Sequence, residues 1–222
     1  MKITKYPQSC VLIEIKGKRI LIDPGSFVYT QTSMTPNDWK GIDVLLLTHQ
    51  HSDHFDPAAV AAIVANNHPA IITNTSVCDI LSQQNIDSEI IRPGGEKVIQ
   101  GISIRGVNVY HGPLPAGLEV SGSKPPEVIG FLIDNAILHP GDCIYIDPEV
   151  GARVLLLPMC DTVTFSPHQA AAFSLIAKPK LVIPIHYHNT RFNVDTDEYA
   201  RVFKEYGVPY RRLNETETIE LE

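Results

Sequence analysis

The sequence has no long hydrophobic run. No apolar stretch approaches the ~18 residues that a membrane-spanning helix needs. The first residues, MKITKYPQSCVLIEI, lack the charged-then-apolar build of a secretory signal peptide. We therefore expect no membrane association and a cytoplasmic location.

Cysteine is scarce, and its spacing excludes two classes of protein. The four cysteines are Cys10, Cys78, Cys143 and Cys160. None belongs to a C-x-x-C pair, so neither a zinc knuckle nor a dithiol redox motif is indicated. Four cysteines would suffice for two disulfides, but a reducing cytoplasm favours free thiols.

The chain also lacks a basic stretch. Lys and Arg total 18 against 25 Asp and Glu, which gives a net charge of −7. Because no Lys/Arg run offers phosphates a basic stripe, we expect no nucleic-acid partner. A small-molecule substrate, including an anionic one, fits better, since bound metal cations would reverse the local field. The length and the 44% apolar content are typical of one globular domain spanning residues 1–222, and a homo-oligomer remains open.

Strand-like and helix-like segments alternate along the chain, which predicts an α/β fold. Residues 44–48 form an apolar run typical of a buried strand, and Asp56 with Pro57 predicts the start of a helix that continues to about Asn66. Ser166-Pro167-His168-Gln169 is a capping box that opens a second helix to about Lys178. Further strands are predicted at 11–15, 19–22, 71–73, 96–109 (a hairpin), 128–133, 136–139, 153–157, 181–185 and 216–221, and further helices at 75–84 and 198–206.

The two capped helices belong to an internal repeat. A shift of 110 residues places Val44-Leu45-Leu46-Leu47 on Val154-Leu155-Leu156-Leu157, and Pro57 on Pro167. Two similar strand–loop–helix–strand units would pack two sheets back to back with helices outside. The alternative is that apolar strands and capped helices look alike by chance. Only the first unit carries the sequence HQHSDH, so the fold of the unit does not require that loop.

This loop holds the strongest chemical signal in the sequence. His49, His51, Asp53 and His54 lie within six residues, directly after the apolar strand. A solvated loop explains one or two histidines, but three with an aspartate indicate a metal site. His49 and His51 would reach one metal, and Asp53 and His54 another. Imidazoles with carboxylates suit Zn²⁺, Fe²⁺ or Mn²⁺ better than Mg²⁺ or Ca²⁺.

The order T-H-x-H-x-D-H at residues 48–54 resembles the signature of the metallo-β-lactamase superfamily. The resemblance covers most of the chain: L-I-D-P-G at 21–25, a lone His111 after a strand, the pair Gly141-Asp142, and His186 after a late strand. It implies a four-layer αββα sandwich of two mixed sheets with outer helices, and a site at one edge between the sheets.

The resemblance also implies the ligands and the reaction. One metal would take His49, His51 and His111, the other Asp53, His54 and His186, and Asp142 would bridge them. Such a site implies a dinuclear hydrolase in which a hydroxide shared by two divalent cations attacks a small ester, lactone or phosphodiester. Zinc is the expected metal, with Mn or Fe open. The stretch I-L-H-P-G-D at 137–142 resembles the branch that includes L-ascorbate-6-phosphate lactonase, although Cys143 replaces the usual threonine.

Other residues receive less specific predictions. Asp53 is expected to help hold the nucleophile, and His139 or His188 to protonate the leaving group. Asp23 is a candidate for orienting a ligand histidine, or for a plain turn. Tyr187, Asn189 and Arg191 are candidates for substrate contact. Alternatives remain open for the distant ligands. His111 could be a loop residue, Asp142 an ordinary turn residue, and His188 could be the ligand in place of His186.

Three rival functions remain. The first is a nuclease of the same superfamily, against which the acidic charge and short length argue. The second is a di-iron redox protein, whose relatives carry an acidic residue where His51 stands and usually an appended flavin domain. The third is a non-catalytic binding module that keeps the metals.

Overall fold

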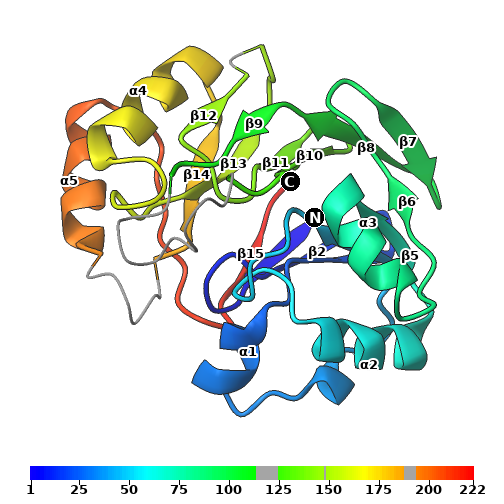
Figure 1. Ribbon diagram of the computed structural model, residues 1–222. Coiled ribbons are helices and arrows are strands. Elements are labelled where there is room, and N and C mark those ends of the chain that lie inside the picture. Colours follow the sequence, from blue (N-terminus) through cyan, green and yellow to red (C-terminus); the bar gives the residue numbers. More distant parts are fainter. Residues whose placement is uncertain (114–124, 148, 188–193) are drawn as a thin grey trace.

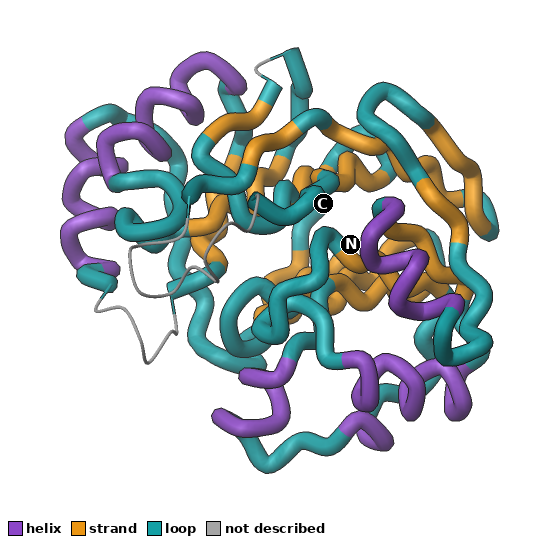
Figure 2. Tube along the Cα trace, viewed as in Figure 1, coloured by secondary structure: helices purple, strands orange, loops and turns teal. Residues whose placement is uncertain are grey.

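The computed structural model describes residues 1–113, 125–147, 149–187 and 194–222. Two mixed β-sheets lie face to face, and helices cover the outer side of each (Figures 1 and 2). This arrangement confirms the predicted αββα sandwich.

The first sheet combines antiparallel and parallel pairing. Its strand order is β15-β1-β2-β3-β4-β5-β6, antiparallel from β15 to β3 and parallel from β3 to β6. Its strands are β1 (Lys2–Lys5), β2 (Val11–Ile15), β3 (Lys18–Ile22), β4 (Val44–Leu47), β5 (Ala70–Thr73), β6 (Glu89–Ile90) and β15 (Thr218–Glu220).

The second sheet has the order β14-β13-β11-β10-β8-β7, parallel from β11 to β14 and otherwise antiparallel. Its strands are β7 (Glu96–Ile99), β8 (Ile102–Val107), β10 (Gly130–Ile133), β11 (Ile137–His139), β13 (Val154–Pro158) and β14 (Leu181–Ile185). Two short strands, β9 (Val109–Tyr110) and β12 (Tyr145–Ile146), pair with each other in a separate ribbon.

Helices α1 (Ser26–Gln31), α2 (Pro57–Asn67) and α3 (Thr75–Ser82) lie with the first sheet, together with the 3₁₀ turn Pro36–Asp38. Helices α4 (Pro167–Ala177) and α5 (Thr196–Glu205) cover the second sheet. None of the helices in the described part of the chain has the length and apolar character that crossing a membrane requires.

The continuous apolar runs are explained by burial on both faces of each sheet. In β4, Val44 and Leu46 enter the core between the sheets, whereas Leu45 and Leu47 pack under the first group of helices. Strand β13 repeats the pattern, with Leu156 between the sheets and Leu155 against the second group of helices. A strand covered on both faces needs apolar residues at every position.

The internal repeat is confirmed by the structure. The bounds of helices α2 and α4 differ by 110 residues. Helix α2 connects the parallel strands β4 and β5, and helix α4 connects the parallel strands β13 and β14. Both helices end in a left-handed residue, His68 in the first and Lys178 in the second. The predicted capping box of Ser166 and Gln169 is also formed.

Strand β1 and helix α1 are among the elements that were not predicted. Strand β1 is half lysine, and it forms because β2 and β15 pair with it on either side. Helix α1 has no side-chain cap, and its start is held by the Ser26 amide, which donates to the Ser52 carbonyl at 2.7 Å. Both elements depend on tertiary contacts. The four cysteines are free thiols.

Candidate metal centre

The loop between β4 and α2 is short and firmly anchored. The carboxylate of Asp56 accepts hydrogen bonds from the amides of Ala58 and Ala59 at 3.0 and 3.1 Å, which caps α2. The His51 carbonyl accepts from the amides of both His54 and Phe55. Because the loop is a tight turn, its histidines and aspartate leave the backbone in different directions.

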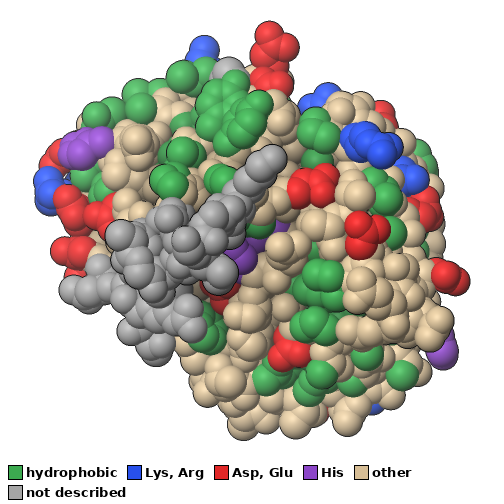
Figure 3. Space-filling view, in the orientation of Figure 1, with side chains coloured by type: hydrophobic (Ala, Val, Ile, Leu, Met, Phe, Trp, Pro, Cys, Tyr) green, Lys and Arg blue, Asp and Glu red, His purple; other side chains and the backbone are tan. Residues whose placement is uncertain are grey.

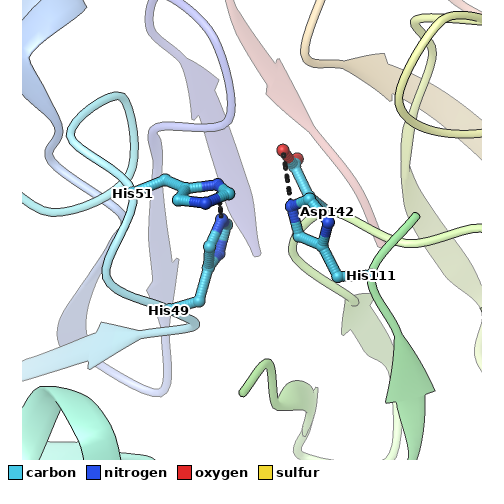
Figure 4. A group of neighbouring side chains, drawn as sticks. All are labelled: His49, His51, His111 and Asp142. Atoms are coloured by element: carbon cyan, nitrogen blue, oxygen red, sulfur yellow. Dashed lines mark hydrogen bonds and ion pairs between the residues drawn. The ribbon is translucent and has the colours of Figure 1, made fainter. Parts of the chain in front are cut away.

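The first group of converging side chains comprises His49, His51, His111 and Asp142. Their candidate ligand atoms all lie within 4.8 Å of one another, and Figure 4 shows them directed toward a common centre. His49 Nε2 is 3.1 Å from His51 Nδ1. That distance is close to the roughly 3.3 Å that separates two ligands of a tetrahedral ion with metal–nitrogen bonds of about 2.0–2.1 Å.

The second group comprises Asp53, His54, His186 and again Asp142, with candidate ligand atoms within the same 4.8 Å limit. His54 Nε2 is 3.1 Å from Asp142 Oδ1, and His186 Nε2 is 3.0 Å from Asp142 Oδ2. Asp142 therefore belongs to both groups. All seven side chains predicted as ligands are brought together, from four separate segments of the chain.

Several polar atoms in the centre are buried without a hydrogen-bond partner. They are the Nε2 atoms of His54, His111 and His186 and the Oδ1 atom of Asp142. The three nitrogens lie 3.0–3.9 Å from the carboxylate oxygens of Asp142. Unsatisfied buried polar atoms are rare, and four in one place indicate a missing partner. Five imidazoles and two carboxylates fit a divalent transition-metal cation.

The Nδ1 atoms of His49, His54 and His111 are hydrogen-bonded so that the Nε2 atoms of these rings keep their lone pairs. Asp23, fully buried, accepts from His54 Nδ1 at 2.7 Å and from the Thr48 hydroxyl at 2.6 Å. The Thr48 hydroxyl in turn accepts from His49 Nδ1 at 3.0 Å, and His111 Nδ1 donates to the Gly112 carbonyl at 2.5 Å. Such bonds fix the tautomer of a ligand histidine. Asp23 thus orients His54, as predicted for one of its two alternatives.

The electrostatics differ between the two groups. Burial, and then the neighbouring His111 and His54, lower the pKa of His51 to about 4. Burial acts to lower the pKa of His54 as well, but the Asp142 and Asp53 carboxylates outweigh it and raise that pKa to about 10. Without metal, His49 and His51 are therefore neutral imidazoles, whereas protons on His54 and His186 balance the carboxylates of Asp53 and Asp142. Cations would replace those protons.

The backbone is strained around the centre. Gln8, Asp23 and His186 have φ values of 57°, 47° and 61°, in the left-handed region that residues other than glycine seldom adopt. Such conformations cost of order 1–3 kcal/mol each and cluster at functional sites. They persist here because each residue makes buried contacts with the centre.

Two glycines allow segments of backbone to approach each other. A Cβ atom on Gly25 would lie 2.1 Å from the backbone carbon and oxygen of Asp53. A Cβ atom on Gly141, which has a φ of +67°, would lie 2.8 Å from the side chain of Thr48. The L-I-D-P-G and Gly-Asp segments therefore pack directly on the metal loop.

His139 is placed differently from the predicted proton donor. It is fully buried, its Nε2 donates to the Ser9 carbonyl at 2.8 Å, and its Nδ1 accepts from the Gly141 amide at 3.3 Å. Because both ring nitrogens are bonded to backbone, neither is free to protonate a leaving group. The contacts favour a positioning role, in which His139 holds the turn that carries Asp142.

The remaining candidates for catalysis and substrate contact fall into two sets. His188, Asn189 and Arg191 lie outside the described residues. Tyr187 is 7% exposed, and its hydroxyl donates to the Leu213 carbonyl. This placement ties the Tyr187 hydroxyl to the chain near Leu213, and its contact with substrate stays a prediction.

Gln8 is a contributor to the site that the sequence did not reveal. Its side-chain amide donates to Asp53 Oδ2 at 3.1 Å. Gln8 lies 45 positions before Asp53 and belongs to no recognisable motif, so nothing in the sequence signals this contact. The centre itself reaches the surface at His51 and Asp53, which are only partly buried. Figure 3 shows histidine side chains near the middle of the face that it draws.

Comparison with protein families gives one match that covers most of the chain. Residues 2–186 match the family described as "Beta-lactamase superfamily domain". A UPF0173 metal-dependent hydrolase from Geobacillus thermodenitrificans is 31% identical over 85% of this chain and 86% of its own. Another from Opitutus terrae is 27% identical over the full length of both chains.

A solved structure shares the whole architecture. Igni18, described as a novel metallo hydrolase from the archaeon Ignicoccus hospitalis, superposes with a TM-score of 0.82 at 22% identity, over 100% of this chain and 99% of that one. The matches named here do not address the narrower resemblance to L-ascorbate-6-phosphate lactonase, which stays a prediction.

Proposed function

Because this chain belongs to the metallo-β-lactamase superfamily and is a metal-dependent hydrolase, we propose that it works with two divalent cations, zinc first among them. We further propose that its substrate is a small ester, lactone or phosphodiester. The net charge of −7 and the absence of a basic run favour a small molecule over a nucleic acid.

The observation that carries this proposal is the position of Asp142 between the two groups. Its Oδ1 faces His54 Nε2 at 3.1 Å, and its Oδ2 faces His186 Nε2 at 3.0 Å and His111 Nε2 at 3.9 Å. Asp142 would therefore bridge two cations. His49, His51 and His111 would hold one of them, and Asp53, His54 and His186 the other.

The residues divide the chemical work. Two divalent cations held by these residues would supply a water molecule whose pKa is lowered to about 7, and positive charge that stabilises the attacked or leaving oxygen. Asp53 is ionised, because His54 and His186 outweigh the effect of burial and hold its pKa well below the usual range. Its side chain is 19% exposed, so its carboxylate is placed to accept a hydrogen bond from the attacking water. Asp23, Thr48 and His139 orient ligands and do not meet the substrate.

The test combines metal analysis with turnover. We expect wild-type protein to contain close to two metal ions per chain and to hydrolyse members of a panel of lactones, esters and phosphodiesters. Asp142→Ala should lose at least one ion, and its kcat should fall by about 100-fold or more, because both cations lose a ligand.

The matched control is Asp161→Ala. Asp161 is an exposed aspartate in the loop of the second repeat, which carries no metal cluster, so this variant should keep metal content and turnover. An Asp142→Ala protein with wild-type metal and activity would refute the bridge. Two ions without turnover of any of the three substrate classes would instead support a non-catalytic binding module.

A further inference from the structure

Gln8 contacts two members of the second ligand group through two different parts of the residue. Its side-chain Nε2 donates to Asp53 Oδ2 at 3.1 Å. Its backbone carbonyl accepts from the His186 amide at 3.0 Å. Gln8 itself is fully buried. One residue in the turn between β1 and β2 thus joins the loop after β4 to the end of β14.

The oxygen that accepts from Gln8, Asp53 Oδ2, is also the Asp53 oxygen that faces the histidines of the second group. Asp53 Oδ2 lies 3.4 Å from His186 Nε2 and 3.9 Å from His54 Nε2. A carboxylate on a partly exposed side chain can rotate, and the bond from Gln8 fixes which oxygen faces the two imidazoles. The donor is a neutral amide. It restrains the carboxylate without placing a positive charge beside a cation, as lysine or arginine would.

Gln8 has two features that destabilise the folded state. Its φ of 57° is in the left-handed region, and its side-chain oxygen is buried without a hydrogen-bond partner. Glycine would relieve the first cost, and an apolar side chain would remove the second. Neither replacement could hold Asp53. The two unfavourable features are therefore explained by the contact with the metal centre.

We propose that Gln8 is a positioning residue for one of the two cations. It holds Asp53 and His186 in place for the cation of the Asp53–His54–His186 group and makes no hydrogen bond to His49, His51 or His111. This inference rests on the proposed two-cation function.

The test is a metal titration of wild type and two variants, Gln8→Met and Gln8→Ala. Methionine keeps the length of the side chain and removes its donor and acceptor, whereas alanine removes the side chain. Metal-free protein is titrated with Zn²⁺ in competition with a chromophoric chelator, and with Co²⁺ followed by its visible absorption. We expect both variants to bind the second equivalent 10–100-fold more weakly, the usual effect of losing a ligand's supporting hydrogen bond. The first equivalent should stay within about threefold of wild type.

The matched control is Ser9→Ala. Ser9 is the next residue, and its buried hydroxyl has no hydrogen-bond partner, so this variant should bind both equivalents as wild type does. Folding of each variant is checked by thermal unfolding of the metal-free form. Folded variants that bind both equivalents normally, or lose both equally, would overturn the role of Gln8. A wild type that takes up a single cation would instead overturn the proposed function on which this inference depends.

Discussion

Asp23→Asn replaces one atom at the hydrogen-bonded support of the metal centre. In the native protein the two carboxylate oxygens of Asp23 accept from the Thr48 amide at 2.8 Å, the Thr48 hydroxyl at 2.6 Å and His54 Nδ1 at 2.7 Å. Asparagine can keep the bond from the Thr48 amide. Its NH₂ group then faces the N–H of His54, and two donors cannot bond to each other.

The imidazole of His54 has one way to relieve this conflict. If its proton moves to Nε2, Nδ1 accepts from the asparagine, but Nε2 no longer offers a lone pair to a cation. Loss of such a support typically weakens metal binding 10–100-fold, or about 1.4–2.7 kcal/mol. The metal-free protein also loses a buried hydrogen bond to a charged group, worth about 1.5–3 kcal/mol. For a chain of this size that lowers Tm by roughly 3–12 °C.

The assay measures both quantities on the same samples. Calorimetric titration gives the affinity for each cation, and thermal unfolding gives the Tm of the metal-free form. Asp87→Asn is the control, because Asp87 is exposed. The second cation should bind more weakly in Asp23→Asn and normally in Asp87→Asn. Asp23→Asn with native affinities and a native Tm would refute the orienting role of Asp23.

Two further predictions concern the backbone and the protons of the centre. Gly25→Ala places a Cβ atom 2.1 Å from Asp53 backbone atoms. It should therefore lower the free energy of unfolding in denaturant by about 3 kcal/mol or more and impair metal uptake. The control Gly151→Ala has open space around the new Cβ atom and should keep wild-type stability; equal stabilities of the two variants would contradict the predicted clash. Because the pKa of His54 is raised to about 10 in the metal-free protein, a cation must displace a proton there, so its affinity should rise as pH increases toward about 10. Burial lowers the pKa of His51 to about 4 and that of His49 well below its usual range, so neither residue should release a proton when a cation binds above that pH. Calorimetry in buffers of different ionisation enthalpy measures the protons released with each cation, and equal release with both would contradict the raised pKa of His54.

The sequence by itself determined the elements whose signals are local. The apolar run of β4 and the Asp56–Pro57 start of α2 predicted a strand, a tight loop and a helix, all of which the structure contains. The repeat at a shift of 110 residues predicted two sheets with outer helices, since two such units must bury their apolar faces against each other. The cluster His49, His51, Asp53 and His54 indicated a metal site, because those residues are neighbours whatever the fold.

Tertiary structure decided everything that depends on register and on distant contacts. His111, Asp142 and His186 each had an ordinary alternative in the sequence, and only the packing of the two sheets brings them to the loop after β4. The contact of Gln8 with Asp53 spans 45 residues and that of His139 with Ser9 spans 130. A hydrogen bond requires two atoms within about 3 Å, and the order of residues along a chain does not specify which distant atoms meet. Folding of the two sheets against each other specifies that.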